Sequence, residues 1–179
     1  LDNATGVLAV LAAAEKQLPL DNQSVRRGLQ ATQVAGRFQV IQHDLPVIID
    51  VAHNPQALQV LRQNLRLFKH DGKTHLIVGM LRDKDIAGSL ALLQGDVDYW
   101  YLVDTPGERG LSAAQLAEKV ADFLPQEVVR QHENVRKAYA AVLQCAGPND
   151  ICVVTGSFLV AGEMLSLLQI TDERNTDDG

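Results

Sequence analysis

The spacing of hydrophobic residues alternates along the chain between a strand-like and a helical pattern. Residues 46–51 form a near-continuous apolar run, which is typical of a strand buried on both faces of a sheet. Residues 54–68 then repeat leucines and a phenylalanine at helical spacing, with Asn54 as the expected N-cap and Pro55 at the first helical position. The same alternation predicts further strands at 38–41, 75–79, 99–103, 128–129 and 151–155 and further helices at 85–93, 112–123, 135–145 and 157–168.

This order of elements predicts the fold class. Strands that alternate with helices build an α/β fold, here with a mainly parallel, Rossmann-like sheet and helices on both faces. Ligands of such folds bind at the carboxyl ends of the strands. Polar side chains that directly follow a strand are therefore the first candidates for a functional site.

The ends of the chain follow a different pattern. Residues 1–34 predict two short helices, separated by a break at 18–20, with Asp21 or Asn22 as the cap of the second. Residues 171–179 are polar and predict a frayed tail. We therefore expect a helical lead-in at 1–34, an α/β domain at 35–170 and a tail at 171–179.

Composition narrows the class of protein. The 179 residues suit one α/β domain, and 46% hydrophobic with 21% charged residues is typical of a globular chain. A net charge of −6 with no basic run argues against nucleic-acid binding, and the chain has no apolar run of membrane-spanning length. Two cysteines without metal-ligand spacing predict free thiols in a cytoplasmic protein without a metal site in this chain. Because the sequence starts at Leu1 without a signal peptide, we expect a fragment of a longer protein.

The polar loop at 50–55 (Asp-Val-Ala-His-Asn-Pro) is the first candidate for chemistry. Asp50 at the end of a buried strand needs a hydrogen-bonding partner, and ribose hydroxyls are one possibility. His53 stands before a helix N-terminus, which favours anions. The alternative is that Asp50 and Asn54 only cap the helix.

Three other positions are candidates, and each has an alternative structural role. Lys84, in the charged loop 79–85, could bind an anion or lie in a solvated loop. Ser157, after Gly156, could bind a ligand or cap its helix. Arg37 stands where the helical lead-in ends; it could be an ordinary surface residue or reach a phosphate held by another domain.

Known nucleotide fingerprints do not occur in this sequence. It contains no G-x-x-x-x-G-K-[ST] phosphate loop and no G-x-G-x-x-G after a strand. The second absence argues against a nicotinamide-dependent oxidoreductase. A stand-alone nucleotide-binding or regulatory α/β module without catalysis remains open.

Four segments together resemble a known family: 36–39 (Gly-Arg-Phe-Gln), 50–55, 79–85 (Gly-Met-Leu-Arg-Asp-Lys-Asp) and 156–158 (Gly-Ser-Phe). In this order and spacing they are similar to the C-terminal part of the folylpolyglutamate synthases, specifically the bifunctional dihydrofolate synthase/folylpolyglutamate synthases of bacteria. These enzymes belong to the wider Mur ligase family. The resemblance extends from Asn3 to about Leu168 and implies a C-terminal domain of the Mur ligase type, preceded by the last two helices of an ATP-binding domain.

The resemblance implies an ATP-dependent amide-forming ligase. Such an enzyme phosphorylates the carboxylate of dihydropteroate or a reduced folate, and L-glutamate then attacks the acyl phosphate. The phosphate loop, the Mg²⁺ ligands and a carbamylated lysine would lie in the missing N-terminal domain, so we expect the isolated chain to be inactive. The full protein is expected to be a cytoplasmic monomer that binds neither nucleic acid nor membranes.

Residue roles follow from the matched motifs. The resemblance implies that Arg37 reaches the ATP phosphates, Asp50 the ribose and Asn3 the adenine. It implies that His53 takes part in catalysis. Lys84 and Ser157 are expected nearest the incoming glutamate.

Overall fold

The computed structural model describes residues 2–17, 21–31 and 34–176, in two compact units that divide between Val34 and Ala35. The first unit contains two helices, α1 (Asp2–Ala13) and α2 (Asn22–Ala31). Asp21 caps α2, since its carboxylate accepts hydrogen bonds from both the backbone N–H and the hydroxyl of Ser24. The predicted break at 18–20 lies outside the described residues.

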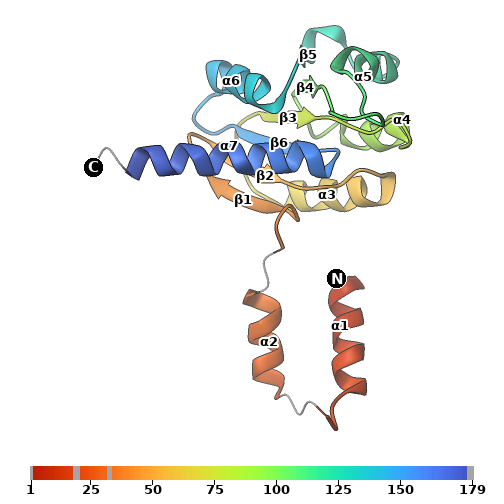
Figure 1. Ribbon diagram of the computed structural model, residues 1–179, viewed down its shortest axis with the longest axis vertical. Helices are drawn as coiled ribbons and strands as arrows, with labels where there is room; N and C mark the ends of the chain where they lie inside the picture. The colour runs from red at the N-terminus through yellow and green to blue at the C-terminus, as the bar shows by residue number, and fades with distance from the viewer. Residues whose placement is uncertain (1, 18–20, 32–33, 177–179) are drawn as a thin grey trace. The chain divides into compact units, whose positions relative to one another are not determined.

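Within residues 34–176, six strands form one sheet in the order β1-β2-β6-β3-β4-β5 (Figure 1). The edge strand β1 (Gln39–Gln42) pairs antiparallel with β2 (Pro46–Ile49). All other neighbours are parallel: β2 with β6 (Ile151–Thr155), β6 with β3 (Thr74–Val78), β3 with β4 (Tyr99–Val103) and β4 with β5 (Val129–His132). The mainly parallel sheet predicted from the sequence is confirmed, with one antiparallel edge.

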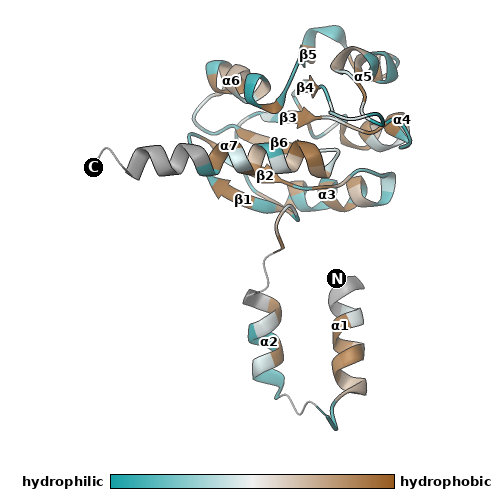
Figure 2. Cartoon of the chain, viewed as in Figure 1, coloured by the Kyte–Doolittle hydropathy of each residue, from teal (hydrophilic) through white to brown (hydrophobic). Residues whose placement is uncertain are grey.

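Helices cover both faces of this sheet because successive strand residues point to opposite sides. On one face, Ile48, Leu76 and Val153 pack beneath α3 (Pro55–Leu67), α4 (Ile86–Leu90) and α5 (Ala113–Val120). On the other face, Ile49, Ile77 and Val154 pack beneath α6 (Val135–Cys145) and α7 (Phe158–Thr176). Figure 2 shows the hydrophobic residues concentrated on the central strands. Burial on two sides explains why these strands have nearly continuous apolar sequences.

The helix caps follow the sequence closely. Asn54 accepts a hydrogen bond from the Ala57 N–H at the start of α3, and Asp85 accepts one from Gly88 at the start of α4. Ser112 and Gln115 form the full capping box of α5.

Several element ends differ from the prediction. The helix expected at 85–93 ends its α-helical part at Leu90 and continues as the 3₁₀ turn η1 (Ala91–Leu93). The helix expected to reach 123 stops at Val120; Pro125 has no N–H to donate to the Ala121 carbonyl oxygen, so the α-helical hydrogen bonds do not continue there. The strand expected at 128–129 lies at 129–132, after the 3₁₀ turn η2 (Gln126–Val128).

The predicted tail at 171–179 begins too early. Helix α7 continues to Thr176, eight residues beyond the predicted end at 168. The segment after Leu168 contains helix-forming glutamine, glutamate and arginine residues, with no glycine or proline before Gly179. Polarity alone was therefore a poor signal for the end of this helix.

Candidate functional site

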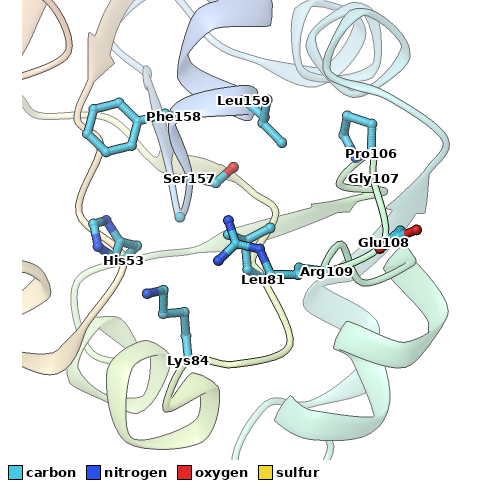
Figure 3. A pocket seen from close by; sticks show the side chains of 11 residues that line it. His53, Leu81, Lys84, Pro106, Gly107, Glu108, Arg109, Ser157, Phe158 and Leu159 are labelled. Carbon is cyan, nitrogen blue, oxygen red and sulfur yellow. The ribbon is translucent and has the colours of Figure 1, made fainter.

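A pocket of about 690 Å³ lies where the carboxyl ends of the parallel strands meet. Loops after β2, β3, β4 and β6 contribute to it, and α7 begins at its wall. Figure 3 shows side chains from these loops directed toward a common space. The polar and aromatic lining includes His53, Lys84, Glu108, Arg109, Ser157 and Phe158.

Gly156 brings three strand ends close together. Its φ of +103° is unfavourable for other residues, and a Cβ atom here would lie 2.5 Å from the Gly79 carbonyl oxygen. The Gly156 N–H and the Thr155 hydroxyl both donate to the Ala52 carbonyl oxygen, at 3.0 and 3.1 Å. The turn between β6 and α7 is therefore tied to the ends of β2 and β3.

His53 is oriented by its own loop. Its Nδ1 lies 2.8 Å from the Val51 carbonyl oxygen. Because a carbonyl can only accept, Nδ1 carries the proton, and the neutral ring has its lone pair on Nε2. The ring also lies against Phe158, with the centroids 6.1 Å apart (Figure 3). His53 is thus available as a proton acceptor, or as a hydrogen-bond donor when protonated.

Ser157 caps α7. Its hydroxyl oxygen accepts the Val160 N–H at 3.2 Å, and its side chain is almost fully buried. Ser157 therefore has the helix-capping role that the sequence analysis considered. A hydroxyl that accepts one hydrogen bond can still donate its own proton, so capping is compatible with ligand binding.

Two cations line the pocket on either side of one carboxylate. Asp83 Oδ2 lies 3.4 Å from Lys84 Nζ and 3.9 Å from Arg109 Nη1. Burial acts to raise the pKa of Asp83, but its own backbone N–H and the charges of Lys84 and Arg109 outweigh this effect and lower it. In Figure 3, Lys84 and Arg109 extend toward the middle of the pocket. The arrangement favours an anionic ligand.

Arg109 was missed in the sequence, although a signal was available. It belongs to the loop 106–110 (Pro-Gly-Glu-Arg-Gly), which directly follows strand β4. The Arg82 N–H donates to the Arg109 carbonyl oxygen, and the Arg82 guanidinium donates to the Gly110 carbonyl oxygen. The search for polar residues after strands, applied to β4 as well, would have found this loop.

Arg37 and Asp50 form a second group beside the sheet, and neither is among the described residues that line the pocket. The Asp50 carboxylate accepts the Phe38 N–H at 2.9 Å and the Ala52 N–H at 2.8 Å. Helix α3 is capped by Asn54, so the interpretation of Asp50 as its cap was wrong. Burial raises the pKa of Asp50, opposed by these two N–H groups and by the charge of Arg37.

Three further points concern Asn3, metal binding and membrane-spanning helices. Asn3 belongs to α1, but its side chain lies outside the described residues. Among the described residues, no group of three or more His, Cys, Asp or Glu side chains could hold a metal ion. None of the helices searched in that same part of the chain has the length and apolar character needed to cross a membrane.

Comparisons with known proteins support the fold described above. The family model "Mur ligase, glutamate ligase domain" matches residues 36–158. The dihydrofolate synthase/folylpolyglutamate synthase of Escherichia coli is 34% identical over 166 residues, covering 93% of this chain and 37% of the relative. The chain therefore spans less than two fifths of that relative's length.

Solved structures show the same similarity. E. coli FolC in complex with DHPP and ADP superposes with a TM-score of 0.85 at 33% identity, covering 95% of this chain and 39% of that one. A bifunctional folylpolyglutamate synthase/dihydrofolate synthase with Mn, AMPPNP and L-glutamate bound has a TM-score of 0.78 at 45% identity, covering 89% and 37%.

Proposed function

This chain belongs to the Mur ligase family as a glutamate ligase domain, and from that premise we propose that it is the C-terminal part of an ATP-dependent ligase. The complete protein would couple L-glutamate to dihydropteroate and to reduced folates. The names of the relatives and the L-glutamate bound to a structural neighbour support this substrate class.

The pocket at the carboxyl ends of the strands is the observation that carries the proposal. L-Glutamate presents two carboxylates, and the pocket offers Lys84, Arg109, the Ser157 hydroxyl and the start of α7. Charge-assisted hydrogen bonds and a helix N-terminus both favour carboxylates. We assign Lys84 and Ser157 to the glutamate side, as the family resemblance implies, and add Arg109.

His53 is proposed to act on the reacting groups. In the ligation, the glutamate amine attacks the carbonyl carbon of the acyl phosphate; an amide bond forms and phosphate leaves. The amine must lose a proton on the way, and Nε2 of His53 can accept it. His53 lines the same pocket as Lys84 and Ser157, so the attacking amine would be held within its reach.

The nucleotide would bind at the second group of residues, Arg37 and Asp50. Arg37 is exposed on a short turn, and a guanidinium suits phosphate oxygens. Each Asp50 oxygen accepts one N–H and retains capacity for a ribose hydroxyl. We keep Asn3 as an adenine contact. ATP and Mg²⁺ supply the phosphorylation, with the phosphate loop and metal ligands expected in the rest of the protein.

The cellular setting is also a proposal. We assign residues 1–34 to the end of the preceding ATP-binding domain and the residues from 35 onward to the glutamate-ligase domain, because α7 continues through the predicted boundary at 170 to Thr176. The complete enzyme is proposed to be a cytoplasmic monomer whose partners are its small-molecule substrates. Sedimentation of the complete protein as a monomer, at micromolar concentration, checks the oligomeric state.

The direct test is glutamate incorporation by the complete protein. Purified protein is given labelled L-glutamate, ATP and Mg²⁺, with dihydropteroate in one reaction and tetrahydrofolate in another. We expect labelled product and one ADP per glutamate added. Nucleotide binding without glutamate transfer to either acceptor would instead support a regulatory nucleotide-binding module.

A further inference from the structure

The turn that presents Arg37 has an unusual backbone. Gly36 has φ +66°, and Phe38 is the non-glycine residue with positive φ among those described, at +42°. A phenylalanine in left-handed geometry costs free energy and persists only where the surroundings hold it. Arg37 lies between these two residues and is itself exposed. The strained Phe38 thus directly follows the residue proposed to bind the nucleotide.

Asp50 holds this turn from the end of β2. Its Oδ2 accepts the Phe38 N–H at 2.9 Å, while its Oδ1 accepts the Ala52 N–H at 2.8 Å. The residue is only 8% exposed, so these N–H groups satisfy a carboxylate that would otherwise be costly to bury. One side chain therefore connects the turn at Phe38 with the loop that leads to His53.

Two further contacts fix the same turn. The Val51 N–H donates to the Gly36 carbonyl oxygen at 2.8 Å, and the Gly36 N–H donates to Gln39 Oε1 at 3.0 Å. The Phe38 ring packs edge-on against Phe68, with the centroids 6.2 Å apart. Backbone and ring contacts thus hold the residues on both sides of Arg37, which is itself exposed.

We propose that Asp50 is a positioning residue for Arg37, which it orients through the backbone N–H of Phe38. The hydrogen bond from Phe38 to Asp50 and the packing of Phe38 on Phe68 together are called the lock below. The inference deepens the proposed function and rests on it as far as Arg37 contacts the nucleotide. A fixed turn removes backbone freedom that Arg37 would otherwise lose when the phosphate binds. Ribose binding by Asp50 alone would require no such connection to Phe38.

The lock itself can be tested in this chain without measuring activity. In Asp50→Asn, only one side-chain oxygen can still accept, and it is neutral, so the bond from the Phe38 N–H is either lost or made to a weaker acceptor. We expect amide hydrogen exchange at Phe38 to accelerate roughly tenfold or more, with faster tryptic cleavage after Arg37, because the opened turn exposes both. Exchange at Ile48 in the core should stay slow.

Asp44→Asn is the matched control, since Asp44 is an exposed carboxylate in the turn before β2. It should leave exchange at Phe38 unchanged. If Asp50→Asn does not fold, Phe38→Gly is the second variant: glycine accepts the left-handed backbone but loses the ring contact, so cleavage after Arg37 should still accelerate. Unchanged exchange at Phe38 in Asp50→Asn, or unchanged cleavage in Phe38→Gly, would overturn the lock.

A double-mutant cycle in the complete enzyme tests whether the lock acts through Arg37. We expect Asp50→Asn to lower kcat on its own and to change kcat less than twofold in an Arg37→Ala background. Fully additive losses would show that Asp50 acts independently of Arg37 and overturn the positioning role. Normal kcat in Arg37→Ala alone would count against the proposed function, while the exchange experiment would still decide the lock.

Discussion

Individual side chains of the pocket differ in how much structure depends on them. Ser157 caps α7, and His53 is anchored to Val51, so substitutions at either position change local structure as well as binding. Lys84 and Arg109 have a shared ionic contact with Asp83 and lie on loops. Substitutions of these two cations should therefore report on ligand binding with little effect on folding.

Arg37 provides the first prediction at this scale. In the complete enzyme, Arg37→Ala should lower kcat by roughly 10²-fold, because one electrostatic contact to the transferred phosphoryl group is lost. Arg37→Lys should recover only part of this, since a point charge replaces a planar fork. Steady-state kinetics beside thermal melting measure both effects. Arg136→Ala on α6, also exposed, is the control; near-normal kcat in Arg37→Ala would make Arg37 an ordinary surface residue.

Asp150 gives a prediction for pH. Burial acts to raise its pKa, but hydrogen bonds from the Gly147 and Lys73 N–H groups and from the His75 ring, which lies 3.0 Å away, lower it below the usual value. The ionised carboxylate therefore stabilises the fold above about pH 4, and this stability is lost as the pH falls through the lowered pKa.

Asp150→Asn should consequently destabilise the chain at pH 7 by about 1.5–3 kcal/mol and flatten the loss of stability in acid. Chemical unfolding between pH 3 and 7, followed by fluorescence of the single buried Trp100, measures this. Asp71→Asn, at an exposed position, should leave the acid profile unchanged. If stability falls with pH in the same way in Asp150→Asn and in the original chain, the stabilising role of the ionised Asp150 carboxylate is contradicted.

Which side chains line the pocket could be predicted better than which groups these side chains contact. His53, Lys84 and Ser157 follow predicted strands, and the structure brings them to one pocket. The partner of Asp50 could not be predicted, because the N–H that donates to it belongs to Phe38, which has left-handed geometry. A single sequence gives no direct signal for a phenylalanine in that conformation.

At the scale of elements, the starts of helices were more predictable than their ends. Asn54 and Ser112 mark their helices by side-chain hydrogen bonds that depend on local sequence alone. Helix ends depend on packing and on weak signals, so α5 was predicted too long and α7 too short. The antiparallel pairing of β1 could not be derived from the hydrophobic pattern either, although a short connection to β2 is consistent with it.

Gly156 supplies the prediction at the scale of elements. Gly156→Ala should destabilise the chain by more than about 2 kcal/mol, because the backbone is strained for alanine and its Cβ would meet the Gly79 carbonyl. Gly162→Ala is the matched control in α7, where nothing lies within 4 Å of the added Cβ; it should stabilise by about 0.5–1 kcal/mol. Melting curves of both variants decide this, and similar values for the two would contradict the proposed role of the turn.

At the scale of the whole molecule, the chain has a core on both faces of its sheet, and we propose that the rest of its active site lies in another domain. Buried residues cover both faces of the sheet within residues 34–176. The sequence has no phosphate loop, and the chain spans 37% of its E. coli relative. The isolated chain should therefore be able to fold without being able to catalyse the reaction.

We predict that the isolated chain folds but does not ligate glutamate. Trp100 fluorescence should show a single cooperative thermal transition, because one two-sided core unfolds as a unit. The same sample should incorporate no labelled glutamate in the presence of ATP. Turnover by the purified chain would contradict the proposed division of the active site between two domains.

The glutamate KM of the complete enzyme tests the central claim most directly, namely that the pocket at the carboxyl ends of the strands binds the incoming glutamate. Lys84→Met and Arg109→Ala should each raise this KM roughly tenfold to a hundredfold, which corresponds to one charge-assisted hydrogen bond, and leave the KM for ATP near normal. Lys119→Met on α5, outside the pocket lining, is the control and should change neither value. Unchanged glutamate KM in both pocket variants would contradict the account.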